Sequence, residues 1–224
     1  MTHQNKMDEP ALTPAEINQA RAYIYQWFSQ QFQTELTELQ WQAVVTGKLR
    51  PFFELLAENG LSTEVEAYET ALAQLAESAG SKARLILASD FAHAFLLSGK
   101  DSVLPYAAAY DTNAQGMLYG ATAEIMKQFL QGVGLALAKD FKEPEDHLAV
   151  YLAALSHMTQ TTSLAEQKQF LDEALMSWLP SFTSSCQALS LQSAVYPALA
   201  QLLLAFIRQD LQFLDANSIV AVQS

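Results

Sequence analysis

The sequence predicts an all-α protein, and three observations support this. Glycine and proline, which interrupt helices, are scarce, with 8 and 7 residues in a chain of 224. The most frequent residues are good helix formers such as alanine, leucine, glutamine and glutamate. No long run alternates polar and apolar residues as a half-buried strand would. Because 50% of the residues are apolar and only 16% are charged, we expect a globular chain with a sizeable core.

Two capping signatures mark helix starts. In "TPAE" (13–16), Thr13 caps, Pro14 suits the first helical position and Glu16 closes a capping box. The apolar stripe that follows predicts a helix over 14–33. A second box, "SLAE" (163–166), opens a helix that we expect to run to about 178 and to be ended by Pro180.

Apolar periodicity and breaker residues place the remaining elements. A long loop is expected over 99–115, and loops of this length in compact domains are often functional. The segment 139–144 is the expected hinge between an N-terminal helical part (1–138) and a C-terminal helical part (145–224). Such a hinge would allow two protomers to exchange C-terminal helices in a domain-swapped homodimer. The other predicted helices span 37–46, 51–58, 62–78, 82–98, 116–135, 145–160, 181–190 and 195–213.

The charge of the chain favours a cationic partner and argues against nucleic acid. The formal net charge is −12, and residues 143–224 hold 8 acidic residues against 2 basic ones. A surface this acidic repels phosphate backbones. The lone Cys186, a polar N-terminus unlike a secretory signal and a longest apolar run of only "LAQLLLAFI" (199–207) predict a cytoplasmic protein without a membrane span.

The stretch "EPEDHLAVYLAAL" (143–155) gathers three carboxylates and an imidazole. Helix initiation explains part of it: Pro144 suits a first turn, and Glu145 and Asp146 would lie near the positive end of the helix dipole. That explanation leaves His147, whose charged form is disfavoured at a helix N-terminus. We therefore expect His147 to be neutral and to make polar contacts.

An enzymatic interpretation of this stretch is the alternative. A small helical hydrolase would use His147 with Glu143 or Asp146, with or without a metal. However, there is no HExxH motif, and His157 would lie about 80° around the helix from His147. Cys186, in "TSSCQALS", lacks the context of a nucleophile and is expected to pack in the core. No glycine-rich phosphate loop occurs, so we predict no catalytic residue, no metal and no cofactor.

A second group of candidates surrounds the predicted long loop. Asp90 lies in the otherwise apolar helix "SDFAHAFL", where the simplest interpretation is a solvent-facing residue. Alternatively Asp90, His93 and Leu97, at helical spacing, would line a groove together with aromatic residues of the loop. An acidic, aromatic groove suits an apolar peptide that carries positive charge.

These motifs, taken in order, resemble a known family. "DFAHAFL" (90–96), P-Y-x-x-x-Y (105–110), "LYG" (118–120), "GVGL" (132–135), "EPEDHLAVYLAAL" and W-L-P-x-F (178–182) together resemble the TorD/DmsD family of redox-enzyme maturation chaperones over nearly the whole chain. Their spacing is most similar to the TorD branch, whose client is trimethylamine N-oxide reductase.

The resemblance implies a cytoplasmic, all-α, non-enzymatic chaperone. Such proteins bind the twin-arginine signal peptide and the body of a molybdenum-cofactor reductase, aid cofactor insertion and delay export. Weak GTP binding has been associated with some members.

The resemblance also implies site residues. Asp146 and His147 match the family's D-H pair, implicated in signal-peptide recognition, so Asp146 is expected to engage the arginines with His147 as a neutral donor or stacking surface. Tyr106 stands where several relatives have another aromatic or a polar residue. The full set of implied peptide-binding residues is Asp90 and Phe91 on one helix, Pro105 and Tyr106 in the loop, and Glu143, Pro144, Asp146 and His147.

Overall fold

The computed structural model describes residues 12–97, 102–111, 120–138 and 141–221. The all-α prediction is confirmed: within these ranges there are helices and no β-strand, and the only strand-like pairing is one isolated antiparallel bridge between Tyr106 and His147. Over the same ranges, no helix is both long enough and apolar enough to cross a bilayer.

The elements before the long loop follow the predicted order. α1 begins after Thr13, whose hydroxyl forms the predicted capping box with Glu16. The elements are α1 (Pro14–Gln33), α2 (Glu38–Val45), α3 (Arg50–Leu56), η1 (Ala57–Leu61), α4 (Ser62–Ala79), η2 (Gly80–Lys82), α5 (Ala83–Phe91) and η3 (Ala92–Leu96). α5 ends in a π-helical turn, which shifts the side chains that follow around the axis. η1 instead joins α3 to α4 through a kink at Asn59 and Gly60, where Gly60 has a φ of 93°.

The later elements contain two departures from prediction. The capping box of Ser163 and Glu166 is confirmed, but the helical stretch that it opens ends at Leu175, and Pro180 lies in the first turn of the next helix. Part of the predicted helix 116–135 lies outside the described residues. The elements are η4 (Ala107–Ala109), α6 (Ala121–Gly132), α7 (Leu148–Thr161), α8 (Leu164–Gln169), η5 (Phe170–Leu175), α9 (Leu179–Gln187) and α10 (Val195–Ala221).

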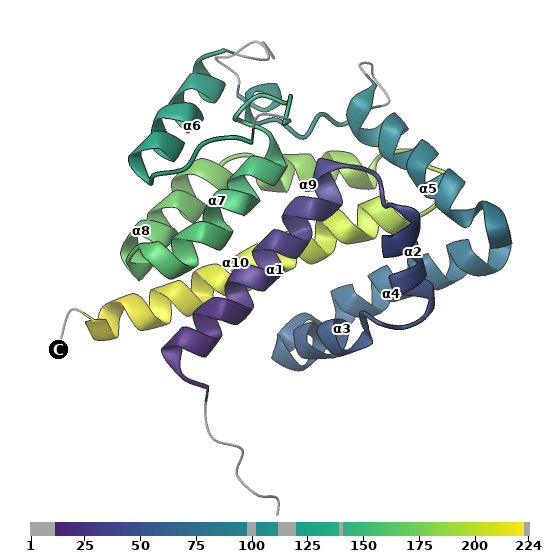
Figure 1. Ribbon diagram of the computed structural model, residues 1–224, viewed down its shortest axis with the longest axis horizontal. Coiled ribbons are helices and arrows are strands. Elements are labelled where there is room, and N and C mark those ends of the chain that lie inside the picture. The colour runs from purple at the N-terminus through teal and green to yellow at the C-terminus, as the bar shows by residue number, and fades with distance from the viewer. Residues whose placement is uncertain (1–11, 98–101, 112–119, 139–140, 222–224) are drawn as a thin grey trace, which may run out of the picture.

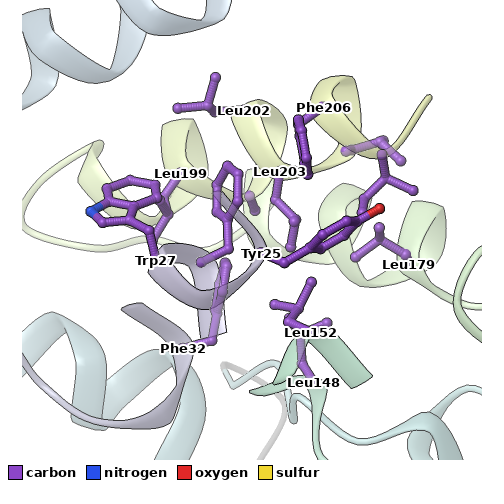
Figure 2. Packing of buried hydrophobic residues seen from close by; sticks show 14 of the residues in the cluster. Tyr25, Trp27, Phe32, Leu148, Leu152, Leu179, Leu199, Leu202, Leu203 and Phe206 are labelled. Atoms are coloured by element: carbon purple, nitrogen blue, oxygen red, sulfur yellow. The ribbon is translucent and has the colours of Figure 1, made fainter. Parts of the chain in front are cut away.

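α1 and α10 form the centre of the molecule. α6, α7 and α8 lie on one side of this pair, and α2 to α5 lie on the other (Figure 1). Figure 2 shows Tyr25 of α1 among Leu203 and Phe206 of α10 and Leu148 and Leu152 of α7. Both parts of the chain on either side of 139–144 thus contribute to one core. Residues 139–140 lie outside the described ranges, and the proposed hinge stays a prediction.

A buried ion pair joins the two central helices. Arg21 of α1 donates to Asp210 of α10 through Nε, at 2.6 Å from Oδ1, and through Nη2, at 2.8 Å from Oδ2. The hydroxyl of Tyr25 donates to the same Oδ2 at 2.6 Å. The Arg21 guanidinium also lies over the ring of Phe213, 5.1 Å from its centroid. Both carboxylate oxygens therefore have cationic or hydroxyl donors, which compensates for their burial.

The solvent-facing interpretation of Asp90 is wrong. Its carboxylate is buried and holds the turn that precedes α10. Oδ1 accepts from the N–H of Gln192 at 2.9 Å, and Oδ2 accepts from the N–H and hydroxyl of Ser193 at 2.9 and 2.7 Å. Because the π-helical turn η3 follows α5, Leu97 does not share a face with Asp90 and is exposed instead.

Candidate functional site

Two short segments that lie far apart in the chain, 105–108 and 143–148, pair side by side. We call this pairing the crossing. The N–H of Leu148 donates to the carbonyl oxygen of Pro105 at 2.7 Å, and the bridge between Tyr106 and His147 lies beside this bond. The structure therefore brings six of the eight predicted site residues together, from the loop and from the acidic stretch.

His147 directly precedes α7 as its N-cap, so the predicted helix start at about 145 is wrong. The helix starts at Leu148, and Nδ1 of His147 accepts a hydrogen bond from the N–H of Ala149 at 3.1 Å as its N-cap. The ring packs edge-on against Tyr106, with centroids 5.0 Å apart, and against Phe141 at 6.0 Å. Burial lowers the pKa of His147 to about 4, which confirms the neutral, polar-contacting imidazole expected from the sequence.

Asp146 lies in the turn before α7 and is fully buried, with 0% of its surface exposed. Its Oδ2 accepts from the N–H of Ala108 at 3.0 Å, and its carbonyl oxygen accepts from the N–H of Ala107 at 3.0 Å. Its Oδ1 is buried with no hydrogen-bond partner. Burial, the largest cause, raises the pKa of this carboxyl group. In this structure the carboxylate does not reach solvent.

Glu143 and Pro144 complete the crossing. The hydroxyl of Tyr106 donates to Oε2 of Glu143 at 2.5 Å, and Glu143 is partly exposed. Pro144 is buried, and its carbonyl oxygen accepts from the N–H of His147 at 3.1 Å. Pro144 does not begin a helix. It belongs to the tight turn that contains Asp146 and that leads into His147 and α7.

Asp90 and Phe91 lie apart from the crossing. Both oxygens of Asp90 are engaged by the turn before α10, as described above. The Phe91 ring packs on Phe95 at 5.3 Å, and Phe95 stacks on Phe182 at 6.1 Å. Phe182 in turn reaches Tyr110 at 6.3 Å. Phe91 is thus linked to the loop only through a row of buried aromatic rings.

A groove of about 770 Å³ opens next to the crossing, between α6, α7 and the α8–η5 stretch. Its walls contain two stacked ring pairs: Tyr110 on Trp178, with centroids 5.6 Å apart, and Phe129 on Phe170 at 4.4 Å. Ile125, 68% exposed, stands on α6 at its edge. The other large apolar side chains of the lining are Met126, Tyr151 and Met158.

The groove is acidic as well as apolar. Asp111, Glu166 and Glu173 belong to its lining, and no lysine or arginine does so among the residues described. Tyr110, an aromatic residue of the predicted long loop, was expected from the sequence to line a groove, and the other lining residues were not. The lining comes from η4, α6, α7, α8 and η5 and from the residues between them, so no single stretch of sequence reveals it.

The side chains of the hydrolase alternative are engaged structurally. Nδ1 of His147 caps α7, and the Asp146 carboxylate is enclosed. Cys186 is buried as predicted, and burial raises the pKa of its thiol. Over the described part of the chain, no three histidine, cysteine, aspartate or glutamate side chains gather in a way that would hold a metal ion.

The sequence is similar to those of several known proteins. A family model described as "Nitrate reductase delta subunit" matches residues 58–184. The "Chaperone protein TorD" of Psychrobacter sp. (strain PRwf-1) is 40% identical over 210 residues, which cover 88% of this chain and 93% of the relative. The TorD chaperone of Vibrio cholerae (strain ATCC 39541) is 37% identical, covering 89% and 94%, and that of Shewanella amazonensis is 33% identical, covering 94% and 99%.

The all-α fold and these matches define a chaperone rather than an enzyme. The chain belongs to the TorD family of redox-enzyme maturation chaperones.

Proposed function

We propose that this chaperone binds the twin-arginine signal peptide and the body of a molybdenum-cofactor reductase precursor in the cytoplasm. The client is trimethylamine N-oxide reductase, and binding holds it for cofactor insertion and delays its export. Family membership supports the maturation role. The similarity of the motif spacing to that of the TorD branch supports the client. The proposal includes no cofactor. The GTP binding implied by the resemblance stays a prediction, as does the domain-swapped homodimer.

The groove is the observation that supports peptide binding. A twin-arginine signal combines a cationic segment with an apolar, helix-forming one. The groove offers aromatic and methionine side chains to the apolar segment and three carboxylates to the arginines. Laying an apolar helical face into such a groove is a common mode of peptide recognition.

The expected affinity is moderate. Two desolvated arginine–carboxylate contacts would contribute about 2–4 kcal/mol, and burial of the apolar segment would supply most of the rest. Because a disordered signal must become ordered on binding, part of this gain is offset. We therefore expect a Kd of roughly micromolar.

The eight predicted site residues have two different roles in this proposal. The six residues of the crossing stand beside the groove and shape it, while the two others support it from α5 through the row of aromatic rings. The crossing residues are Pro105, Tyr106, Glu143, Pro144, Asp146 and His147, and those on α5 are Asp90 and Phe91.

Calorimetric titration with a synthetic twin-arginine signal peptide tests the proposal. The control peptide carries glutamine in place of both arginines. We expect micromolar binding of the first and binding weaker by about tenfold or more for the second, since both charge contacts are lost. Equal affinity for both peptides, or no binding of either, would contradict the role of the groove.

Two surface variants test whether the peptide binds in the groove. Ile125→Asp puts a charge into the apolar edge of the groove and should weaken binding by about tenfold. Leu85→Asp is the matched control, because Leu85 is similarly exposed (60% against 68%) but lies on α5 and does not line the groove. Equal effects of the two changes would show that the peptide binds elsewhere.

A further inference from the structure

We propose that Asp146 is a positioning residue, which fixes one wall of the groove through the backbone of Ala107 and Ala108 and does not itself contact the arginines of the peptide. This inference rests on the proposed function for its ligand. It assigns Asp146 a different role from the direct contact expected from the sequence.

The hydrogen bonds of Asp146 lead directly to the groove. Its carbonyl oxygen and Oδ2 accept from the N–H groups of Ala107 and Ala108, both at 3.0 Å. These two alanines begin the short η4 turn, in which the N–H of Tyr110 donates to the carbonyl oxygen of Ala107 at 3.0 Å. Ala107 and Tyr110 line the groove, so one residue fixes both the start and the end of this wall.

The stack of Tyr110 on Trp178 depends on the same turn. The two rings lie 5.6 Å apart and nearly parallel, at 20°. Tyr110 directly follows η4, whereas Trp178 precedes α9 and also packs edge-on against Tyr151 at 5.7 Å. If η4 shifted, Tyr110 would move with it and would no longer stack on Trp178. A peptide would then meet a groove of different width.

Enclosure argues against direct contact between Asp146 and an arginine. The residue has no exposed surface and does not belong to the lining of the groove. An arginine could reach its carboxylate only if the residues that enclose it moved. The carboxylates of the groove lining are instead those of Asp111, Glu166 and Glu173. Glu166 and Glu173 lie on the exposed side of their helices, where each accepts hydrogen bonds from its own helix through Oε2.

The unpaired oxygen of Asp146 supports a functional constraint on this position. Its Oδ1 is buried without a hydrogen-bond partner, which costs stability. Native proteins seldom retain such a group without a reason. Holding the N–H of Ala108 beside the groove supplies that reason, because an apolar side chain at position 146 would leave this N–H unpaired.

A double-mutant cycle between protein and peptide separates the two roles. Asp146→Ala and Asp146→Asn are titrated against the twin-arginine peptide and its glutamine control. A positioning residue predicts that Asp146→Ala weakens both peptides by the same factor, about tenfold, so that the two changes are additive. Asp146→Asn keeps an oxygen acceptor for Ala108 and should stay within about twofold of the wild type for both peptides.

Two further variants calibrate the cycle. Glu173→Gln removes a carboxylate that lines the groove and should weaken only the twin-arginine peptide, by about threefold. Glu145→Ala removes the carboxylate next to Asp146, which accepts neither of the bonds from Ala107 and Ala108, and should change neither affinity by more than about twofold. The inference is overturned if Asp146→Asn weakens the twin-arginine peptide as much as Asp146→Ala while the glutamine peptide binds unchanged.

Amide hydrogen exchange tests the positioning role of Asp146 without a ligand. Asp146→Ala should speed exchange of the Ala108 amide by about tenfold or more and leave the buried amides of α1 and α10 unchanged, whereas Asp146→Asn should not. Unchanged exchange at Ala108 in Asp146→Ala overturns the inference. If the wild type binds neither peptide, the proposed function fails, and the exchange measurement still decides whether Asp146 holds this wall.

Discussion

Two buried aspartates in this molecule have opposite surroundings. Asp210, 4% exposed, receives two hydrogen bonds from Arg21 and one from Tyr25 at the centre of the α1–α10 pair. The carboxylate of Asp146, 0% exposed, accepts one hydrogen bond, from the N–H of Ala108, and its other oxygen has no partner. The first carboxylate holds the centre of the fold, and we propose that the second holds the edge of the groove. Both residues are buried, and they differ in how completely their oxygens are hydrogen-bonded.

The largest expected effect is that of Asp210→Ala. Removing this carboxylate leaves Arg21 charged and buried without its partner, which should lower the free energy of unfolding by about 3–5 kcal/mol. Urea unfolding measures this loss. The control replaces both partners, as Arg21→Met with Asp210→Leu, and should cost far less because no buried charge remains. A loss below about 1 kcal/mol in Asp210→Ala would mean that Arg21 reaches water easily and that the contrast with Asp146 is weaker than it looks.

Asp90→Ala should come next. Asp90 accepts three hydrogen bonds from Gln192 and Ser193, and none comes from a cation, so its removal strands donors but no buried charge. We expect a loss of about 2–3 kcal/mol in the free energy of unfolding. Faster amide exchange at Gln192 and Ser193 would locate the damage at the turn before α10. A loss of affinity for the signal peptide at full stability would instead assign Asp90 to the groove.

Asp146→Ala should cost less stability than either change. It strands the N–H of Ala108 but also removes an oxygen that has no partner, so the two effects partly cancel. We expect a loss of about 1–2 kcal/mol in urea unfolding. A loss as large as that of Asp210→Ala would show that the crossing is part of the fold's central support, and it would remove the distinction drawn here.

The smallest effect concerns His147 and depends on pH. The unfolded chain protonates this imidazole near its ordinary pKa of 6.5, whereas the folded chain does so only near 4. The unfolded state thus binds more protons between these values, so the free energy of unfolding falls as the pH falls through this window. Between pH 7 and pH 6 the loss should be roughly 0.5–1 kcal/mol.

His147→Asn isolates that contribution. Asparagine is a good N-cap but does not titrate, so the variant should lose less stability than the wild type as the pH falls from 7 to 6. The raised pKa of Asp146 has the opposite effect, because it makes the free energy of unfolding rise as the pH falls. His147→Asn retains this effect of Asp146. Parallel pH profiles of the two proteins would show that His147 protonates equally easily in both states.

The sequence predicted the helices best where their signals are local. The capping boxes of Thr13 and Ser163 set two helix starts to the residue, because all their partners lie within one turn. The start of α7 was misplaced because Glu145 and Asp146 look like first-turn carboxylates. What moves the helix start to Leu148 is the pairing with Pro105 and Ala107, and no local pattern encodes that contact.

The candidate site was predicted in part for the same reason. The resemblance implied eight peptide-binding residues, and the structure places six of them together at the crossing and the other two apart. Their role in peptide binding stays a prediction. The resemblance did not reveal that Asp146 is enclosed, since burial depends on the loop that covers it. The groove acids Glu166 and Glu173 went unnoticed because one occurs in a capping box and the other on an ordinary polar helix face.

The crossing also makes the chain from Ala108 to Glu145 a closed excursion. It leaves and returns at one place, held by the backbone bonds between Pro105 and Leu148 and between Ala107 and Asp146. The excursion carries α6 and one side of the groove, whereas α1, α7 and α10 lie outside it. Because its two ends are held together, a change in its length would cost little additional closure entropy. Its helix is nevertheless tied to the rest of the molecule, since Met126 and Leu130 of α6 belong to the core cluster. Met126 also lines the groove, so a substitution there would be felt in the core and in the groove at the same time.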